Sequence, residues 1–120
     1  MSHPSILVVD DDSSIRRIVA EILLMEEYEV VTAPNGAEAL LAVEHERPAL
    51  VLLDMRMPVL DGWGFVQGLK ERDIDVPILV MTAAQDTARW AAEVGAAGHL
   101  AKPFEMSELL SAVERLCQAG

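Results

Sequence analysis

Apolar and polar residues alternate along this chain in two different rhythms. Short apolar runs are bounded by polar or turn-forming residues, as is typical of fully buried strands of a parallel sheet. Between these runs, apolar residues recur at intervals of three and four, which predicts amphipathic helices. Strands are expected at residues 5–10, 28–32, 49–54, 76–82 and 97–101, and helices at about residues 13–26, 37–44, 65–72, 84–94 and 106–117.

Turn and capping residues mark several of the predicted ends. Ser13 and Ser14 are candidate N-caps of the first helix, and Gly95 is placed to end the fourth. Strands that alternate with helices in this way are joined by right-handed crossovers, with helices on both faces of the sheet. We therefore predict an α/β fold, a doubly wound parallel sheet of five strands with five helices, in a single domain over residues 1–120.

Polar side chains stand where four of these strands end. In an open parallel sheet, functional residues collect at the carboxyl ends of the strands, so these side chains are expected to converge on one edge. Carboxylates, a hydroxyl and an ammonium group at one place can hold a divalent cation and a phosphoryl group. The residues are Asp10, Asp11 and Asp12 after the first strand, Asp54 at the end of the third, Thr82 at the end of the fourth and Lys102 after the fifth.

The charge and hydropathy of the chain exclude several classes of protein. The chain carries 20 acids and 9 bases, a net charge of −11, which argues against nucleic-acid binding by this domain. The apolar runs are too short to span a membrane, and residues 1–4 do not have the pattern of a signal peptide. The single Cys117 excludes an internal disulfide. We expect a soluble cytoplasmic protein without membrane contact.

The carboxylates suggest both a metal and a reaction. Asp10, Asp11 and Asp54 can supply the oxygen ligands that Mg²⁺ prefers, directly or through water. Clustered carboxylates repel one another, so without a cation they lower stability or take up protons. A carboxylate is also a competent nucleophile for phosphorus, and phosphoryl transfer requires mainly positioning and charge neutralisation. A metal and Lys102 would supply that charge.

Four segments together carry a family resemblance, which extends over essentially the whole chain. They occur in the order and spacing of the receiver domain of bacterial two-component response regulators, which the chain therefore resembles. The segments are Val8-Val9-Asp10-Asp11-Asp12, Leu53-Asp54-Met55-Arg56-Met57-Pro58 with Asp61-Gly62 after it, Met81-Thr82-Ala83, and Lys102-Pro103-Phe104.

The resemblance implies a fold, a reaction and a partner. The fold would be flavodoxin-like, with strand order 2-1-3-4-5. Asp54 would accept a phosphoryl group from a histidine of a sensor kinase or a histidine phosphotransfer protein. Asp10 and Asp11, with the backbone carbonyl of Arg56, would serve Mg²⁺. The domain would not be an enzyme beyond its own phosphorylation and dephosphorylation.

The same resemblance implies how the phosphoryl group is held and read. Thr82 and Lys102 would bind the phosphoryl oxygens, and the Lys102–Pro103 bond would be cis. Switching would move the Thr82 hydroxyl toward the phosphoryl group while an aromatic residue of the fifth strand turns inward. His99 occupies that position here, where Tyr or Phe is commoner. A partner protein or output domain would use the face of the fourth helix, fifth strand and fifth helix.

Side chains near the predicted site bear on phosphoryl lifetime and on packing. Arg56 and Ala84 occupy positions that tune lifetime in this family, and neither can orient a water, so the phosphoryl group is not expected to be unusually short-lived. Trp63 is either a core anchor or a half-exposed reporter of the site. Trp90 either belongs to an interface or packs against a neighbouring helix.

Three other classes of protein fit the sequence less well. A phosphatase of the haloacid-dehalogenase type needs a second aspartate two residues after the nucleophile, where Arg56 stands. A flavodoxin needs a hydroxyl- and glycine-rich phosphate loop after the first strand, where three aspartates would repel a phosphate. A pseudo-receiver, which binds proteins without being phosphorylated, would have no need for a complete site. The sequence does not identify the kinase, the pathway, the oligomeric state, or whether the domain is part of a longer regulator.

Overall fold

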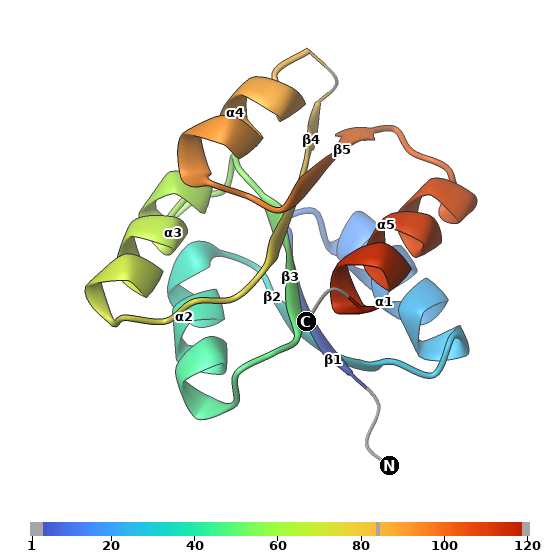
Figure 1. The fold of residues 1–120 in the computed structure, drawn as a ribbon, viewed down its shortest axis with the longest axis horizontal. Helices are drawn as coiled ribbons and strands as arrows, with labels where there is room; N and C mark the ends of the chain where they lie inside the picture. Colours follow the sequence, from blue (N-terminus) through green and yellow to red (C-terminus); the bar gives the residue numbers. More distant parts are fainter. Residues whose placement is uncertain (1–3, 84, 119–120) are drawn as a thin grey trace.

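A computed structural model describes residues 4–83 and 85–118 of the chain. The strands form one parallel sheet in the order β2-β1-β3-β4-β5, with five helices around it, so the predicted fold class and strand order are confirmed (Figure 1). The strands are β1 (Ser5–Val9), β2 (Glu29–Ala33), β3 (Leu50–Asp54), β4 (Ile78–Ala83) and β5 (Gly98–Lys102). The helices are α1 (Ser13–Met25), α2 (Gly36–His45), α3 (Gly62–Glu71), α4 (Thr87–Val94) and α5 (Met106–Gln118).

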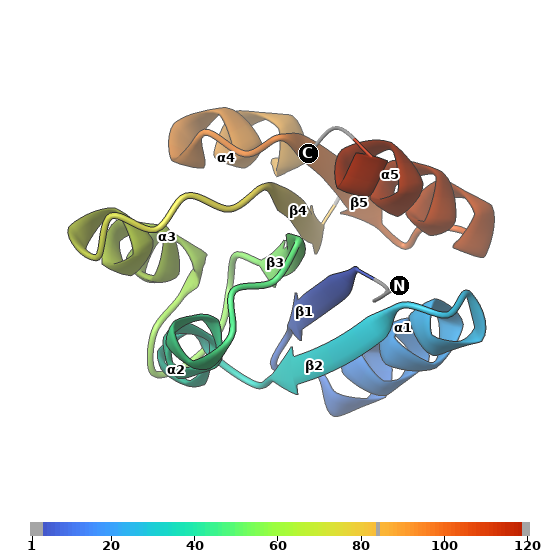
Figure 2. The same cartoon turned by 60° about the horizontal axis from the view of Figure 1, so that its bottom comes forward.

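The helices cover the two faces of the sheet unequally. Alternate residues of each strand point to opposite faces, so Ile6 and Val8 pack in one core cluster and Leu7 and Val9 in the other. The first cluster lies beneath α1 and α5, and the second beneath α2, α3 and α4 (Figure 2). Because β3 is covered on both faces, all five of its residues are buried, which explains why its sequence is apolar up to Asp54.

The register of the strands brings their carboxyl ends level. Val9 pairs with Leu53, and Asp54 pairs with Met81. Asp10, the residue after Val9, therefore lies next to Asp54 at the edge of the sheet. Lys102 pairs with Ala83 at the same edge.

Two details of the helix ends differ from the sequence-based expectation. Asp12, rather than Ser13 or Ser14, is the N-cap of α1, and its carboxylate accepts from the backbone N–H groups of Ser14 at 2.9 Å and Ile15 at 3.2 Å. An ionised carboxylate is a stronger acceptor at a helix N-terminus than a hydroxyl, which accounts for the choice.

The fourth helix is also shorter than expected. It begins at Thr87 rather than at residue 84, which lies outside the described residues, and Asp86 caps it without a side-chain hydrogen bond. Because alanine favours helix without marking where one begins, the sequence could not fix this end. Gly95 ends the helix with φ of 68°, as predicted.

Among the described residues, no helix has the length and apolar character needed to cross a bilayer.

Candidate functional site

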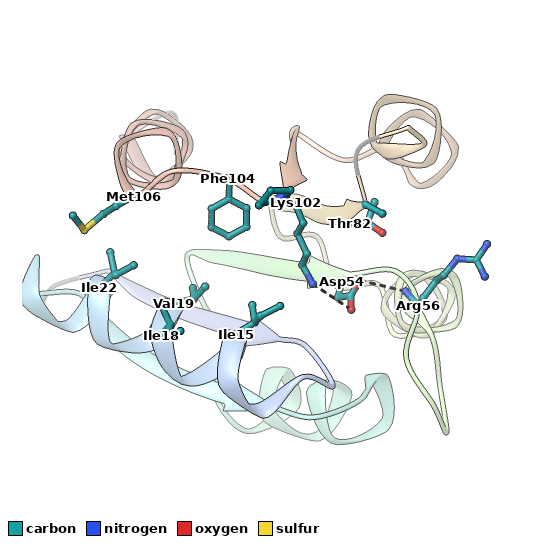
Figure 3. Close-up of a pocket in the computed structure, with 12 residues that line it drawn as sticks. Ile15, Ile18, Val19, Ile22, Asp54, Arg56, Thr82, Lys102, Phe104 and Met106 are labelled. Atoms are coloured by element: carbon teal, nitrogen blue, oxygen red, sulfur yellow. Dashed lines mark hydrogen bonds and ion pairs between the residues drawn. The ribbon is translucent and has the colours of Figure 1, made fainter.

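Four side chains that the sequence placed at strand ends converge at the carboxyl edge of the sheet. Asp10 is fully buried, and Asp54 and Thr82 are 6% and 3% exposed. The Lys102 side chain is 21% exposed and extends to the carboxylates (Figure 3). The structure thus brings together two carboxylates, a hydroxyl and an ammonium group, each from the end of a different strand.

Lys102 pairs with both buried carboxylates. Its Nζ lies 2.6 Å from Asp10 Oδ2 and 3.6 Å from Asp54 Oδ2. Asp10 is held further by a backbone N–H of Asp12, at 3.0 Å from Asp10 Oδ1. The Lys102–Pro103 bond is cis, as the resemblance implied.

Three carboxylates form a set of possible metal ligands. One oxygen each from Asp10, Asp11 and Asp54 lies within 4.8 Å of the others. An all-oxygen, partly exposed set of this kind suits a hard cation such as Mg²⁺, which keeps several of its waters. Asp12 does not belong to the set, because its carboxylate caps α1. The Arg56 backbone N–H lies 3.5 Å from Asp54 Oδ1, so the backbone of residue 56 adjoins the same carboxylate.

The surroundings of Asp54 disfavour its charge. Burial raises the pKa of Asp54 from 3.8 to about 6, and the charges of Asp10 and Asp11 act in the same direction. The Lys102 ammonium and the Arg56 N–H act against them. Three carboxylates face the single Lys102 ammonium, so Lys102 alone does not neutralise the cluster.

An apolar pocket of about 570 Å³ opens beside Asp54. It runs between α1 and the segment that leads from β5 into α5 (Figure 3). Ile18 and Met106 on its two sides are 51% and 52% exposed. The signal in the sequence that could have pointed to this pocket is the apolar stripe of α1, which lines one side of it. Its aliphatic and aromatic walls are formed by Ile15, Ile18, Val19, Ile22, Phe104 and Met106.

His99, the predicted switch residue, is exposed on β5, and its role stays a prediction. Of the two positions predicted to tune phosphoryl lifetime, Arg56 is described by the structure. Ala84 lies outside the described residues.

The two tryptophans form a layer between α3 and α4. Trp90 is 5% exposed and belongs to the core, which excludes the interpretation of it as an exposed interface residue. The rings of Trp63 and Trp90 meet edge to face, with centroids 4.9 Å apart. The guanidinium carbon of Arg56 lies 5.0 Å from the centroid of Trp90. Sequence reasoning did not anticipate this contact, because it joins side chains that are far apart in the chain.

Comparison with known proteins gives one consistent result. The family model of the response regulator receiver domain matches residues 6–114. The chain is 47% identical over 118 residues to the probable transcriptional regulator ycf27 of Cyanophora paradoxa, covering 97% of this chain and 49% of that protein. It is 39% identical over 117 residues to sporulation initiation phosphotransferase F of Bacillus subtilis, covering 96% of this chain and 94% of that protein.

Solved structures agree with these matches. The receiver domain of NtrX from Brucella abortus superimposes with a TM-score of 0.88 at 34% identity, covering 96% of this chain and 99% of that one. The chain spans about half the length of the transcriptional regulators that it matches.

Proposed function

The chain belongs to the family of response regulator receiver domains, and from this premise we propose that it accepts a phosphoryl group on Asp54 from a phosphohistidine of a sensor kinase or phosphotransfer protein. The observation that carries the proposal is the pairing of a buried carboxylate, Asp54, with Lys102 beside two further carboxylates. In the reaction, a carboxylate oxygen of Asp54 forms a bond to phosphorus as the bond from phosphorus to the histidine nitrogen breaks. The imidazole keeps that electron pair and takes up a proton.

The protein's own groups are placed for this step. Asp54 attacks as the ionised form, and a pKa of about 6 leaves it mostly ionised at neutral pH. The Lys102 ammonium, which lies 3.6 Å from Asp54, and the buried Thr82 hydroxyl would bind the phosphoryl oxygens. These roles are supported by position and by the family's motifs.

Asp10, Asp11 and Asp54, with the backbone carbonyl of Arg56, would hold Mg²⁺. When bound, Mg²⁺ supplies positive charge that offsets the repulsion between these carboxylates and an incoming phosphoryl group. The donor set fits, because it is composed of oxygens and carries more negative charge than Lys102 neutralises.

The apolar pocket beside Asp54 is suited to the protein that brings the phosphohistidine. Its exposed Ile18 and Met106 offer apolar surface next to the reacting carboxylate. An amphipathic helix of the phosphodonor could bury these side chains while its histidine approaches Asp54.

The phosphorylated domain would then act through the face formed by α4, β5 and α5. Its transcription-regulator relatives support an output domain in the same protein, whereas the near full-length match to phosphotransferase F supports a separate partner. We expect this exchange in the cytoplasm, without nucleic-acid contact by this domain and without enzymatic turnover of other phosphoesters.

The test is intact mass after incubation with acetyl phosphate, with Mg²⁺ and with a chelator. We expect one phosphoryl adduct that requires Mg²⁺ and is absent from Asp54→Asn. Asp75→Asn, which changes an exposed acid away from the site, is the matched control and should behave as the parent does. The absence of an adduct from folded parent protein with Mg²⁺ would contradict the proposal and favour a pseudo-receiver.

A further inference from the structure

Arg56 has an unusual placement for a cation next to an acidic cluster. Its backbone N–H lies 3.5 Å from Asp54 Oδ1, yet its side chain extends away from Asp54 (Figure 3). Among the described residues it forms no ion pair; the pairs involve Arg72, Arg89 and Lys102 instead. A flexible guanidinium two residues from Asp54 would be attracted to uncompensated carboxylates, so a contact that favours another position of the side chain bears on the metal site.

The Arg56 guanidinium contacts the ring of Trp90 on α4 instead. The guanidinium carbon lies 5.0 Å from the centroid of the Trp90 ring, within the range of a cation–π interaction. A guanidinium stacks well on an indole face because it is planar and weakly hydrated.

Trp90 is itself fixed in place. It is 5% exposed and meets Trp63 of α3 edge to face at 4.9 Å. The Trp63 indole N–H donates to the Glu93 carboxylate of α4 at 3.0 Å. The ring beneath the Arg56 guanidinium is therefore a buried part of the packed contact between α3 and α4.

We propose that Arg56 is a positioning residue for the metal site: Trp90 holds its guanidinium away from Asp10, Asp11 and Asp54, so that this charge does not compete with a divalent cation. Binding of Mg²⁺ and the Arg56–Trp90 contact are then coupled, since each favours the same arrangement of residue 56, and such coupling is reciprocal. This inference rests on the proposed function, because it takes Mg²⁺ as the ligand of that acidic cluster.

The first test is a double-mutant cycle on the Kd for Mg²⁺, measured by calorimetry. Trp90→Leu removes the ring face, which frees the guanidinium to pair with the carboxylates, and we expect it to weaken Mg²⁺ binding about threefold to fivefold. In the Arg56→Met background there is no guanidinium to release, so the same Trp90→Leu change should have no effect on the Kd. Trp90→Phe, which preserves an aromatic core residue, should give a smaller effect in the same direction if Trp90→Leu proves too unstable.

This cycle separates positioning from a general structural role. If Trp90 acts only by supporting the fold, its replacement will weaken Mg²⁺ binding equally in both backgrounds, which would overturn the inference. Arg89→Met removes a cation from α4 itself, where Arg89 pairs with Asp86. It is the matched control and should leave the Trp90→Leu effect intact.

The second readout is spectroscopic. The chain has two tryptophans, so Trp63→Phe leaves Trp90 as the sole indole. Mg²⁺ should change its emission with the same Kd as calorimetry reports, and adding Arg56→Met should abolish that change while binding persists. An emission unaffected by saturating Mg²⁺ would overturn the inference.

The parent protein distinguishes the two levels of failure. If the parent neither binds Mg²⁺ nor forms an adduct, the proposed function and this inference fail together. If it does both, but the Trp90 effect is equal in both backgrounds, this inference alone fails.

Discussion

At the scale of single residues, Asp54 lies in surroundings that disfavour its negative charge. Burial is the main reason that its pKa is raised to about 6, from 3.8. Between pH 3.8 and about pH 6, the folded protein therefore keeps a proton on Asp54 that the unfolded protein has released. The contribution of Asp54 to the free energy of unfolding is fully present below about pH 4. It is lost as the pH rises through 6, and the whole change amounts to roughly 3 kcal/mol.

The measurement is urea unfolding of the parent and of Asp54→Asn in chelator from pH 4 to pH 8. The variant lacks the titrating group, so it should gain roughly 3 kcal/mol of stability relative to the parent over this range. Saturating Mg²⁺ should recover the parent's loss above pH 6, because the cation favours the ionised carboxylate. A difference between the two proteins that does not change with pH would contradict the prediction.

A second residue is strained by its backbone. Val59 has φ of 70°, in the left-handed region that β-branched residues rarely adopt, and its side chain is 81% exposed. Val59→Asn should therefore raise the free energy of unfolding by about 1 kcal/mol, since asparagine tolerates this conformation and little burial is lost. The control is Val31→Asn on β2, where the valine is 45% exposed in a strand. There the change should lower stability, because valine suits a strand better. A stabilising effect at both positions would point to side-chain polarity rather than to strain.

At the scale of elements, the helix caps differ in what they contribute. The Asn35 side-chain oxygen accepts from the Glu38 N–H at 2.9 Å at the start of α2, whereas Asp86 makes no such bond at the start of α4. Asn35→Ala should lower the free energy of unfolding by about 1 kcal/mol, and Asp86→Ala by less than about 0.5. Denaturant midpoints of the two variants measure both effects. Equal losses would mean that capping geometry is not the cause.

The elements also show how far the sequence determines the structure. All the strands were predicted to within two residues at either end. For β3 the reason is burial on both faces, because a doubly buried strand has no polar interruption before its last residue, Asp54. The meeting of Asp10, Asp54 and Lys102 followed from parallel strands whose ends align. The start of α4 did not follow, because no side chain caps it. The stacking of Arg56 on Trp90 also could not be predicted, because it depends on how two side chains on separate elements turn.

At the scale of the whole molecule, the two faces of the sheet differ in what they leave exposed near the site. The apolar pocket that opens at Asp54 lies on the side of the sheet that α1 and α5 cover. Within the part of the chain that the structure describes, no pocket on the other side reaches Asp54. Exposed apolar side chains continue from it along α1, where Leu24 and Met25 are 55% and 71% exposed. A protein phosphodonor should therefore approach from this side, whereas a small phosphodonor needs only Asp54 and its neighbours.

Ile18→Asp separates these two requirements. A carboxylate in the middle of an apolar contact must be desolvated on docking, so phosphotransfer from a protein donor should slow at least about tenfold, equivalent to about 1.4 kcal/mol. The donor is whichever kinase in a purified panel phosphorylates the parent fastest.

Leu41→Asp is the matched control, since Leu41 is 67% exposed on α2 at the other face of the sheet. Acetyl phosphate should modify both variants at the parent's rate, because Ile18 contributes docking surface rather than reacting groups. Equal slowing of the two variants with the kinase would place the docking surface elsewhere, and slowing of Ile18→Asp with acetyl phosphate would mean that the substitution disturbs the site itself.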